Sequence, residues 1–381
     1  MKILLLSFLL IYSIPYISNC QIQSFVEFDS LYEIDAPIVT RDQVSIYKND
    51  LFFASNSKSK KFLRISNLSK NLNYELHLPD TISFHPCRGF IISEDIIYYY
   101  DYRLIHAFSL SNKDPKHLFS TNKRGCVRSI KVIQDKLYLY GVAYCSFNTD
   151  TDKQTAINVF DLKKKNRVFS EYPNPSARGF SYFQPSKVIE IDTNRVFIAD
   201  YDKYRIMIYD YDKNIVDSIK YSPSEWVSTT DMIPDYPVGS HDPGSYIKKI
   251  NPFTNKISLM NNISLLPNNN LLVAWTIPKD EDYEYVMRYD IWEKKEGEWK
   301  ISKSNIEDFI PDSAKLMDKY SLPIKMGFKI VDNYLIVRYR GSTIKNFKES
   351  FGKPYEEFIE INEKYFLENE LKTLVGVYKI K

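Results

Sequence analysis

One segment of the chain holds a group of side chains whose types and spacing suit acid-base or metal chemistry. His241 and Asp242 are adjacent, and Asp231 and Asp235 precede them in PSEWVSTTDMIPDYPVGSHDPGSYIKK. An imidazole beside carboxylates is the combination that proton transfer and metal binding use. One histidine beside acids does not define a catalytic centre, so we predict these four residues as ligand-binding residues.

The sequence lacks the common catalytic motifs. The other four histidines are scattered, and the chain contains neither an HExxH motif nor a cysteine pair at zinc spacing. It also has no GxSxG elbow and no glycine-rich phosphate loop. We therefore predict no catalytic residue, no bound metal and no cofactor.

Two aspartate pairs resemble the clustered carboxylates that Ca²⁺ prefers. They are Asp200 with Asp202 in DYDKY, and Asp210 with Asp212 in YDYDKN. Aspartate is also a common turn residue because its side chain bonds to nearby backbone amides. We interpret both pairs as turn residues.

Arginine precedes glycine at the entrance of three predicted repeats, at Arg88, Arg124 and Arg178. A guanidinium fork suits a carboxylate or a phosphate, so the three arginines could form a basic mouth that binds an anionic ligand. The alternative is that they form ordinary surface salt bridges. Their distances from the following turn differ, so they are not equivalent positions.

The N-terminus has the features of an export signal. Lys2 precedes the apolar run ILLLSFLLIYSIPYIS, which is followed by NCQ and then by polar sequence. The string ISNC resembles a lipobox, although Asn19 replaces the usual small residue before the cysteine. We predict a signal peptide over residues 1–19 and lipidation at Cys20; ordinary cleavage or an uncleaved anchor are the alternatives.

A repeated unit of strands and turns fills the rest of the chain. Six hairpin signals are present, in which a polar turn separates two apolar strands. They are VSIYKNDLFFAS, GFIISEDIIYYYD, IKVIQDKLYLYG, VIEIDTNRVFIAD, ISLLPNNNLLVAW and FKIVDNYLIVRY. A third strand follows each hairpin: FLRISNLSK, LIHAFSLSNK, INVFDLKKK, IMIYDYDKN, VMRYDIWEKK and FIEINEK.

The length of the unit predicts the fold. A four-stranded propeller blade takes about 40 to 50 residues, and the first two intervals fit that length while later ones are longer. We predict an all-β, six-bladed β-propeller of four-stranded antiparallel blades, forming one domain over residues 21–381. The segment SFVEFDSLYEID would complete the last blade beside TLVGVYKIK.

The signal with Cys20, the unit VFIADYDKYRIMIYDYDKN and the final strand VGVYKIK together resemble the six-bladed TolB-like or NHL-like β-propeller lipoproteins of Gram-negative envelopes. The resemblance covers nearly the whole chain. It implies the propeller fold and a place in the bacterial cell envelope, as an outer-membrane lipoprotein. It implies no catalytic residue.

The connections predict which end of the propeller binds a ligand. In antiparallel blades, the turns between first and second strands share one end with those between third and fourth strands, and the other connections share the opposite end. The extra length falls at that opposite end, above all in an inserted loop at about 221–256. Loops this long are often functional, and Trp226 and Tyr236 argue against disorder here.

Two functions fit these features. The first is a non-catalytic binding or scaffolding module for an envelope protein, peptide or glycan, held to the membrane through its lipid alone. The second is a hydrolase or lyase that acts on an extracellular substrate at the central funnel, with a metal in some versions. The 51 basic and 48 acidic side chains leave a net charge of +3, which gives no reason to expect nucleic acid as a partner.

A disulfide between Cys126 and Cys145 follows from one assumed turn. If Asp135 and Lys136 form a two-residue hairpin turn, the two cysteines lie directly opposite on neighbouring strands. That separation suits a disulfide, and export would expose the pair to an oxidising compartment. A bulge or a one-residue slip would leave both thiols reduced. We expect Cys87 to be a small buried apolar residue.

Overall fold

The structure is a computed structural model of the chain. It describes residues 26–34, 43–56, 62–83, 85, 87–101, 103–110, 115–122, 126–142, 154–162, 166–173, 189–200, 203–228, 256–278, 285–306, 322–342 and 371–381. The predicted signal peptide, with Cys20, lies outside these residues.

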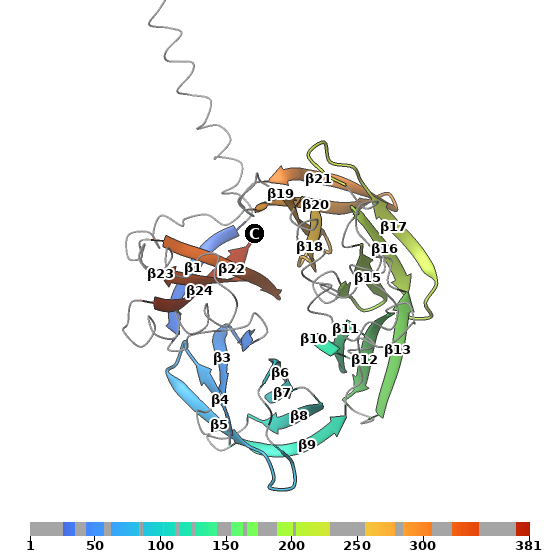
Figure 1. The fold of residues 1–381 in the computed structure, drawn as a ribbon. Coiled ribbons are helices and arrows are strands. Elements are labelled where there is room, and N and C mark those ends of the chain that lie inside the picture. The colour runs from blue at the N-terminus through green and yellow to red at the C-terminus, as the bar shows by residue number, and fades with distance from the viewer. Residues whose placement is uncertain are drawn as a thin grey trace, which may run out of the picture. The chain divides into compact units, whose positions relative to one another are not determined.

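The described residues form six four-stranded antiparallel sheets, which are the blades of a six-bladed β-propeller (Figure 1). Blade 1 contains β2 (Val44–Tyr47), β3 (Asp50–Asn56), β4 (Phe62–Asn67) and β5 (Leu72–His77). Blade 2 contains β6 (Gly89–Ser93), β7 (Ile96–Tyr100), β8 (Leu104–Ser109) and β9 (Lys116–Asn122). Blade 3 contains β10 (Cys126–Ile133), β11 (Lys136–Val142), β12 (Gln154–Asp161) and β13 (Asn166–Pro173). Blade 4 contains β14 (Ile189–Ile191), β15 (Arg195–Ala199), β16 (Arg205–Asp210) and β17 (Ile215–Lys220). Blade 5 contains β18 (Leu259–Leu265), β19 (Leu271–Pro278), β20 (Tyr285–Lys295) and β21 (Glu298–Ile306). Blade 6 contains β22 (Leu322–Val331), β23 (Tyr334–Ser342), β24 (Leu371–Ile380) and β1 (Val26–Ile34). The fold class predicted from the repeat is confirmed.

Tight turns close the hairpins that the sequence predicts. Lys48 and Asn49 both have positive φ angles, 49° and 64°, between β2 and β3, and Glu94 and Asp95 repeat the pattern between β6 and β7. Two consecutive residues with positive φ define the turn whose twist matches that of the flanking strands. Turns of this kind make the first hairpin of these blades short and rigid.

The chain divides into two compact units, one of residues 42–305 and one of residues 1–41 with 306–381. The larger unit contains blades 1 to 5, whose strands follow each other in chain order from blue to orange in Figure 1. The smaller unit contains blade 6. Each is described by itself.

Neighbouring blades of the larger unit pack through apolar side chains on both faces of their inner strands. Leu137 belongs to the cluster shared with blade 2, whereas the next residue, Tyr138, belongs to the cluster shared with blade 4. Val196 and Phe197 divide in the same way between blades 3 and 5. Because successive side chains of a strand point to opposite faces, a strand between two blades must be apolar on both. This explains why RIMIYD and its counterparts do not alternate cleanly.

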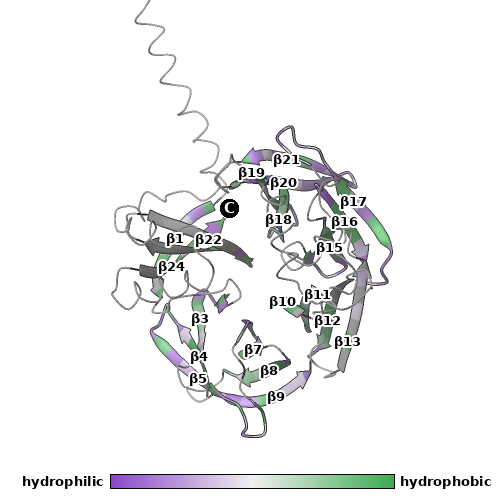
Figure 2. Cartoon of the chain, viewed as in Figure 1, coloured by the Kyte–Doolittle hydropathy of each residue, from purple (hydrophilic) through white to green (hydrophobic). Residues whose placement is uncertain are grey.

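The fourth strands are more exposed than the inner ones. Figure 2 shows hydrophilic residues along β5, β9 and β17. By contrast, every residue of β7 after the first is buried. The core therefore lies between the inner strands of adjacent blades.

The first strand of the chain completes the blade formed by the last strands. β1 pairs with β24, from Val26 opposite Ile380 to Ile34 opposite Thr373. This confirms the predicted pairing of SFVEFDSLYEID with TLVGVYKIK. One expectation was wrong: the third strand of blade 6 is β24 itself, and FIEINEK lies outside the described residues. The prediction failed because residues 343–370 separate β23 from β24, a longer interval than the one between the second and third strands of any other blade.

The register of blade 3 differs from the one assumed for the disulfide. Ile133 pairs with Lys136, so the turn residues are Gln134 and Asp135 instead of Asp135 and Lys136. A bulge between Val127 and Ser129 then shifts the pairing again, and Cys126 lies opposite Val142. Cys145 lies outside the described residues, so the bridge stays a prediction, but the register on which it rested was wrong.

Cys87 is buried with 3% of its surface exposed, as predicted, and packs in the cluster between blades 1 and 2. Within the described ranges, the structure contains no helix long and apolar enough to cross a membrane.

Candidate functional site

The two ends of blades 1 to 5 differ. The hairpin turns between the first and second strands share one end, which we call the turn end: the Lys48 ammonium of blade 1 lies 2.9 Å from the Asp95 carboxylate of blade 2, and the Tyr47 hydroxyl accepts the Asp95 amide. The opposite end, the loop end, is where the chain leaves the second and fourth strands. Residues 143–153, 174–188 and 221–258 all connect strands there.

The longest of these connections is closed at its base. The Val227 amide donates to Ser258 Oγ at 2.9 Å, and the Ser258 amide donates to the Val227 carbonyl at 2.8 Å. Ser258 is fully buried and comes directly before β18. The two hydrogen bonds fix both ends of residues 228–257 beside each other, so this segment is an insertion with a defined base. We call it the insert.

Aromatic rings hold Trp226, which lies two residues before the insert. The ring of Trp226 lies 5.7 Å from that of Tyr204 and 5.6 Å from that of Trp275. Tyr204 comes from the connection between β15 and β16, and Trp275 comes from β19, so Trp226 packs on blades 4 and 5 together. Its neighbour Glu225 adds an ion pair, with its carboxylate 3.5 Å from Arg288 Nε. The base of the insert is thus built into the core.

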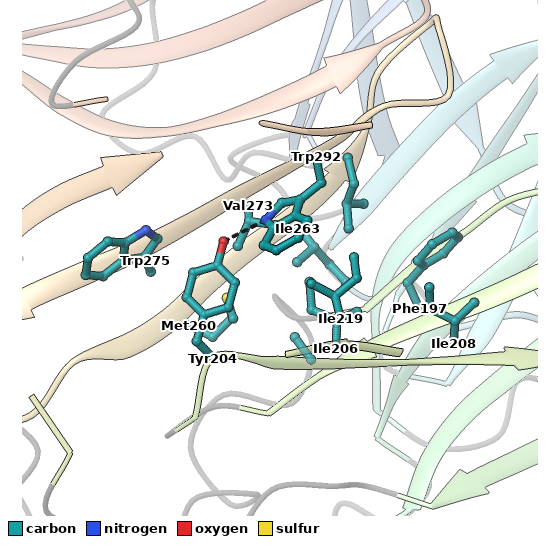
Figure 3. Close-up of a cluster of buried hydrophobic side chains, with 12 residues drawn as sticks. Phe197, Tyr204, Ile206, Ile208, Ile219, Met260, Ile263, Val273, Trp275 and Trp292 are labelled. Atoms are coloured by element: carbon teal, nitrogen blue, oxygen red, sulfur yellow. Dashed lines mark hydrogen bonds between the residues drawn. The ribbon is translucent and has the colours of Figure 1, made fainter. Parts of the chain in front are cut away.

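A buried carboxylate organises this aromatic cluster. Asp290 accepts hydrogen bonds from the Tyr204 hydroxyl at 2.7 Å, the Trp275 indole at 2.9 Å and the Asn305 amide at 2.7 Å. The Trp292 indole donates to the Tyr204 hydroxyl at 2.9 Å, the contact drawn as a dashed line in Figure 3. All these partners belong to blades 4 and 5.

Burial sets the titration of this hub. Removal from water raises the pKa of Asp290, and the donors from Tyr204, Asn305 and Trp275 oppose that change. Burial and the neighbouring Asp290 carboxylate raise the pKa of Tyr204 well above its usual value. Because every polar atom described here has a partner from a strand or a turn, we interpret the hub as the support of the insert.

The structure describes two of the predicted ligand-binding residues. Trp226 is half-buried in the cluster above, so most of its ring serves packing. Arg88 is exposed just before β6, and its amide donates to the Tyr100 carbonyl at 2.9 Å. The remaining predicted residues lie outside the described residues: Arg124, Arg178, Asp231, Asp235, Tyr236, His241 and Asp242.

Of the aspartates interpreted as turn residues, Asp210 has that role, since its Oδ1 accepts the Asn214 amide at 2.8 Å. Asp200 is fully buried and forms an ion pair instead, with its Oδ2 accepting from Arg205 Nε at 2.6 Å. Among the residues that the structure describes, no three histidine, cysteine, aspartate or glutamate side chains group as metal ligands.

Sequence reasoning missed one polar cluster entirely. Asp101, His106, Ser120 and His117 form a continuous hydrogen-bonded chain in the outer half of blade 2. His106 and His117 are part of the scattered histidines, and only the pairing of β8 with β9 brings His106 opposite Ser120. No local motif carries this signal.

A second polar contact joins the first strands of three blades near the turn end. Lys131 of β10 donates to the Glu190 carboxylate of β14 at 3.0 Å and to the Ile191 carbonyl at 3.0 Å. The other oxygen of Glu190 accepts the Leu265 amide of β18 at 3.4 Å. Glu190 is buried, so this ion pair helps to fix blades 3, 4 and 5.

Comparison with known proteins finds distant similarities to solved structures. No family model and no curated protein matches the sequence. The N-terminal domain of Nup159 is similar at 10% identity, over 84% of this chain and 78% of its own, with a TM-score of 0.40. The WD40 domain of Neurospora crassa Pan2 is similar at 10% identity, over 85% and 83%, with a TM-score of 0.43. A luciferin-regenerating enzyme is similar at 10% identity, over 92% and 96%, with a TM-score of 0.44. Similarities of this size carry no argument about function.

Proposed function

We propose that the protein is a non-catalytic binding or scaffolding module of the bacterial envelope, which engages a protein, peptide or glycan through its loop end. The observation that supports this proposal is the closed base of the insert. Val227 and Ser258 join the two ends of a long segment to the rigid frame of blades 4 and 5. A rigid scaffold that carries long connections at one end is a common arrangement for binding sites.

The described polar clusters support a binding role over a catalytic one. The Asp290 hub and the Lys131–Glu190 pair connect strands of different blades and are buried or half-buried. Groups used in this way stabilise the frame. The frame, in turn, determines where the connections at the loop end begin and end.

The anchor is a separate part of the proposal. Lipidation at Cys20 would hold the propeller at a membrane surface and leave its blades in the aqueous phase. Labelling of cells with a palmitate analogue tests it, with Cys20→Ala as the control variant. Equal incorporation into both proteins would contradict lipidation at this residue.

The binding experiment uses the closed base. Residues 229–256 are replaced by a short Gly-Ser linker, which keeps Trp226, Val227 and Ser258 in place. The control variant replaces Lys48 and Asn49 at the turn end by Asn-Gly, which suits the positive φ angles of that turn. Each protein is then used to capture partners from an envelope extract and is tested on a glycan array.

We expect the insert deletion to lower partner recovery at least tenfold, because the surface that carries the contacts is gone. The turn-end variant should retain the recovery of the wild type. Matching far-ultraviolet circular dichroism spectra and unfolding midpoints show that both variants fold. Unchanged capture by the folded deletion variant would contradict binding through the insert.

A further inference from the structure

Four side chains of blade 2 form one hydrogen-bonded chain. Asp101 Oδ2 lies 3.1 Å from His106 Nε2, His106 Nδ1 lies 2.7 Å from Ser120 Oγ, and Ser120 Oγ lies 2.8 Å from His117 Nε2. Asp101 directly follows the second strand of the blade, β7, while His106 lies on β8 and the other two lie on β9. This hydrogen-bonded chain therefore runs from the core of the blade to its outermost strand.

The Asp101 carboxylate determines the direction of each hydrogen bond. Its Oδ1 accepts the amides of Arg103 at 2.6 Å and Leu104 at 2.7 Å, so this carboxyl group is an acceptor. His106 must then donate from Nε2 to Asp101 Oδ2. A neutral His106 has an acceptor at Nδ1, to which Ser120 donates its hydroxyl proton, and Ser120 Oγ accepts from His117 Nε2–H.

Burial separates the two histidines into an inner and an outer one. The side chains of Asp101 and His106 are fully buried, and the ring of Tyr99 stacks on His106 with 4.5 Å between centroids. Ser120 and His117 are partly exposed. The outer imidazole is accessible to solvent, and Ser120 links it to the inner one.

We propose that this chain is a proton-uptake site, in which His117 takes a proton from solvent and Ser120 passes it to the buried His106 beside Asp101. Two protons move in the same direction in this step, and each of the four side chains keeps a hydrogen-bond partner afterwards. His117 gives its Nε2 proton to Ser120 Oγ, while Ser120 gives its hydroxyl proton to His106 Nδ1. Neutral His117 keeps the added proton at Nδ1, and His106 becomes an imidazolium that donates to Asp101 and to Ser120.

The geometry limits the chain to one added proton. If both imidazoles were charged, Ser120 Oγ would face an N–H group on each side, and its own proton would have no ring nitrogen to bond to. The two positive charges would also repel each other. The pKa of His117 is already lowered, first by partial burial and then by the nearby His106.

The titratable and aromatic groups that face this chain come from each strand around it. Tyr99 of β7 covers the inner ring, and burial, together with Cys87 and Asp101, raises the pKa of its phenol far above the physiological range. Phe108 of β8 meets the ring of His117 edge-on at 5.2 Å. Among the described residues, Asp101 is thus the carboxylate in contact with this hydrogen-bonded chain.

The test follows the two imidazoles by NMR on the full mature protein between pH 8 and pH 5. The Cε1–H signals are assigned with His106→Gln and His117→Gln variants. In the wild type we expect both signals to move with one common midpoint and a total uptake of one proton. His77, which lies on β5 of blade 1, serves as an internal reference for an independent histidine.

Ser120→Ala removes the linking hydroxyl, and Ser120→Thr keeps it. We expect the His106 signal to stop moving in Ser120→Ala, while His117 titrates alone, and the coupled behaviour to return in Ser120→Thr. A His106 titration that is unchanged in folded Ser120→Ala would overturn the relay. Uptake of two protons by the wild type, measured against His117→Gln by potentiometric titration, would overturn it as well.

Discussion

The Tyr204 hydroxyl and the Asp290 carboxylate lie 2.7 Å apart, although 86 residues separate them in the chain. Tyr204 enters from the connection between β15 and β16, and Asp290 from β20, so this hydrogen bond ties blade 4 to blade 5. Trp226, the residue that leads into the insert, packs on the ring of the same Tyr204. The bond therefore links the packing of two blades to the base of the insert.

We expect Tyr204→Phe to lower the free energy of unfolding by about 2 kcal/mol, because the Trp292 indole and the Asp290 carboxylate each lose a buried partner. Urea unfolding of wild type and variant measures the change. Tyr221→Phe is the control, since Tyr221 packs at the edge of the same cluster and is only half-buried. Equal effects of both substitutions would contradict a special role for the Tyr204 hydroxyl.

Replacement of Trp226 by alanine should destabilise the protein by about 2 kcal/mol, because the ring packs on Tyr204 and Trp275 but is only half-buried. The same variant should be cleaved faster by a protease within residues 229–255, since the anchor of that segment is lost. Ser224→Ala, at an exposed neighbouring position, is the matched control and should leave both quantities near those of the wild type. The prediction fails if cleavage is equally slow in both variants.

Asp101 makes stability depend on pH. Burial alone would raise the pKa of this carboxyl group, but hydrogen bonds from His106 and from two backbone amides lower it below its ordinary value of 3.8. A carboxyl group with a lowered folded-state pKa stabilises the fold above its unfolded pKa and loses that contribution as pH falls through the folded one. Stability from this group should thus decline below about pH 4.

The measurement compares unfolding free energies of wild type and Asp101→Asn from pH 7 to pH 2. The difference between them should be largest at neutral pH and shrink below about pH 4. Asp80→Asn changes an exposed carboxylate and serves as the control. A difference that stays constant across the range would show that Asp101 contributes through packing alone.

The turn between β20 and β21 offers a test of backbone geometry without packing. Gly297 has φ +84°, and a Cβ added there would meet no atom within 4 Å. Gly297→Ala should therefore lower the free energy of unfolding by about 1 kcal/mol through the backbone conformation alone.

Glu296, at φ 54°, should have the opposite response: Glu296→Asn raises the melting temperature, because asparagine tolerates positive φ better than glutamate. Thermal unfolding of both variants decides the matter.

Hairpins and blades could be predicted because their signals are local. The turn between β6 and β7 is set by two adjacent polar residues, Glu94 and Asp95, between apolar runs. Such a pattern repeats along the chain, and its period predicts the number of blades. The pairing of the first strand with β24 could also be predicted. The sequence left one strand outside the repeats, and pairing it with the last strand covers an otherwise exposed strand edge.

Register was harder to predict. The disulfide argument placed the turn of blade 3 one residue too late and did not include the bulge near Val127. The turn was misplaced because Gln134, Asp135 and Lys136 are all polar, so the sequence pattern does not distinguish two neighbouring turn positions. The bulge between Val127 and Ser129 has no signal in that pattern. In blade 6, the third strand was misassigned because β24 follows β23 after a longer interval than in the other blades, and the predicted strand FIEINEK lies within that interval.

The sequence by itself determined the all-β class, the six repeated blades and the end of the blades that receives the long connections, since all three follow from periodicity and turn residues along the chain. Tertiary structure alone decided which polar side chains meet. His106 reaches Ser120 through the pairing of β8 with β9, Tyr204 reaches Asp290 across two blades, and Val227 reaches Ser258 across the insert. Such contacts depend on register and on blade-to-blade packing, which join residues far apart in the chain and leave no local pattern in the sequence.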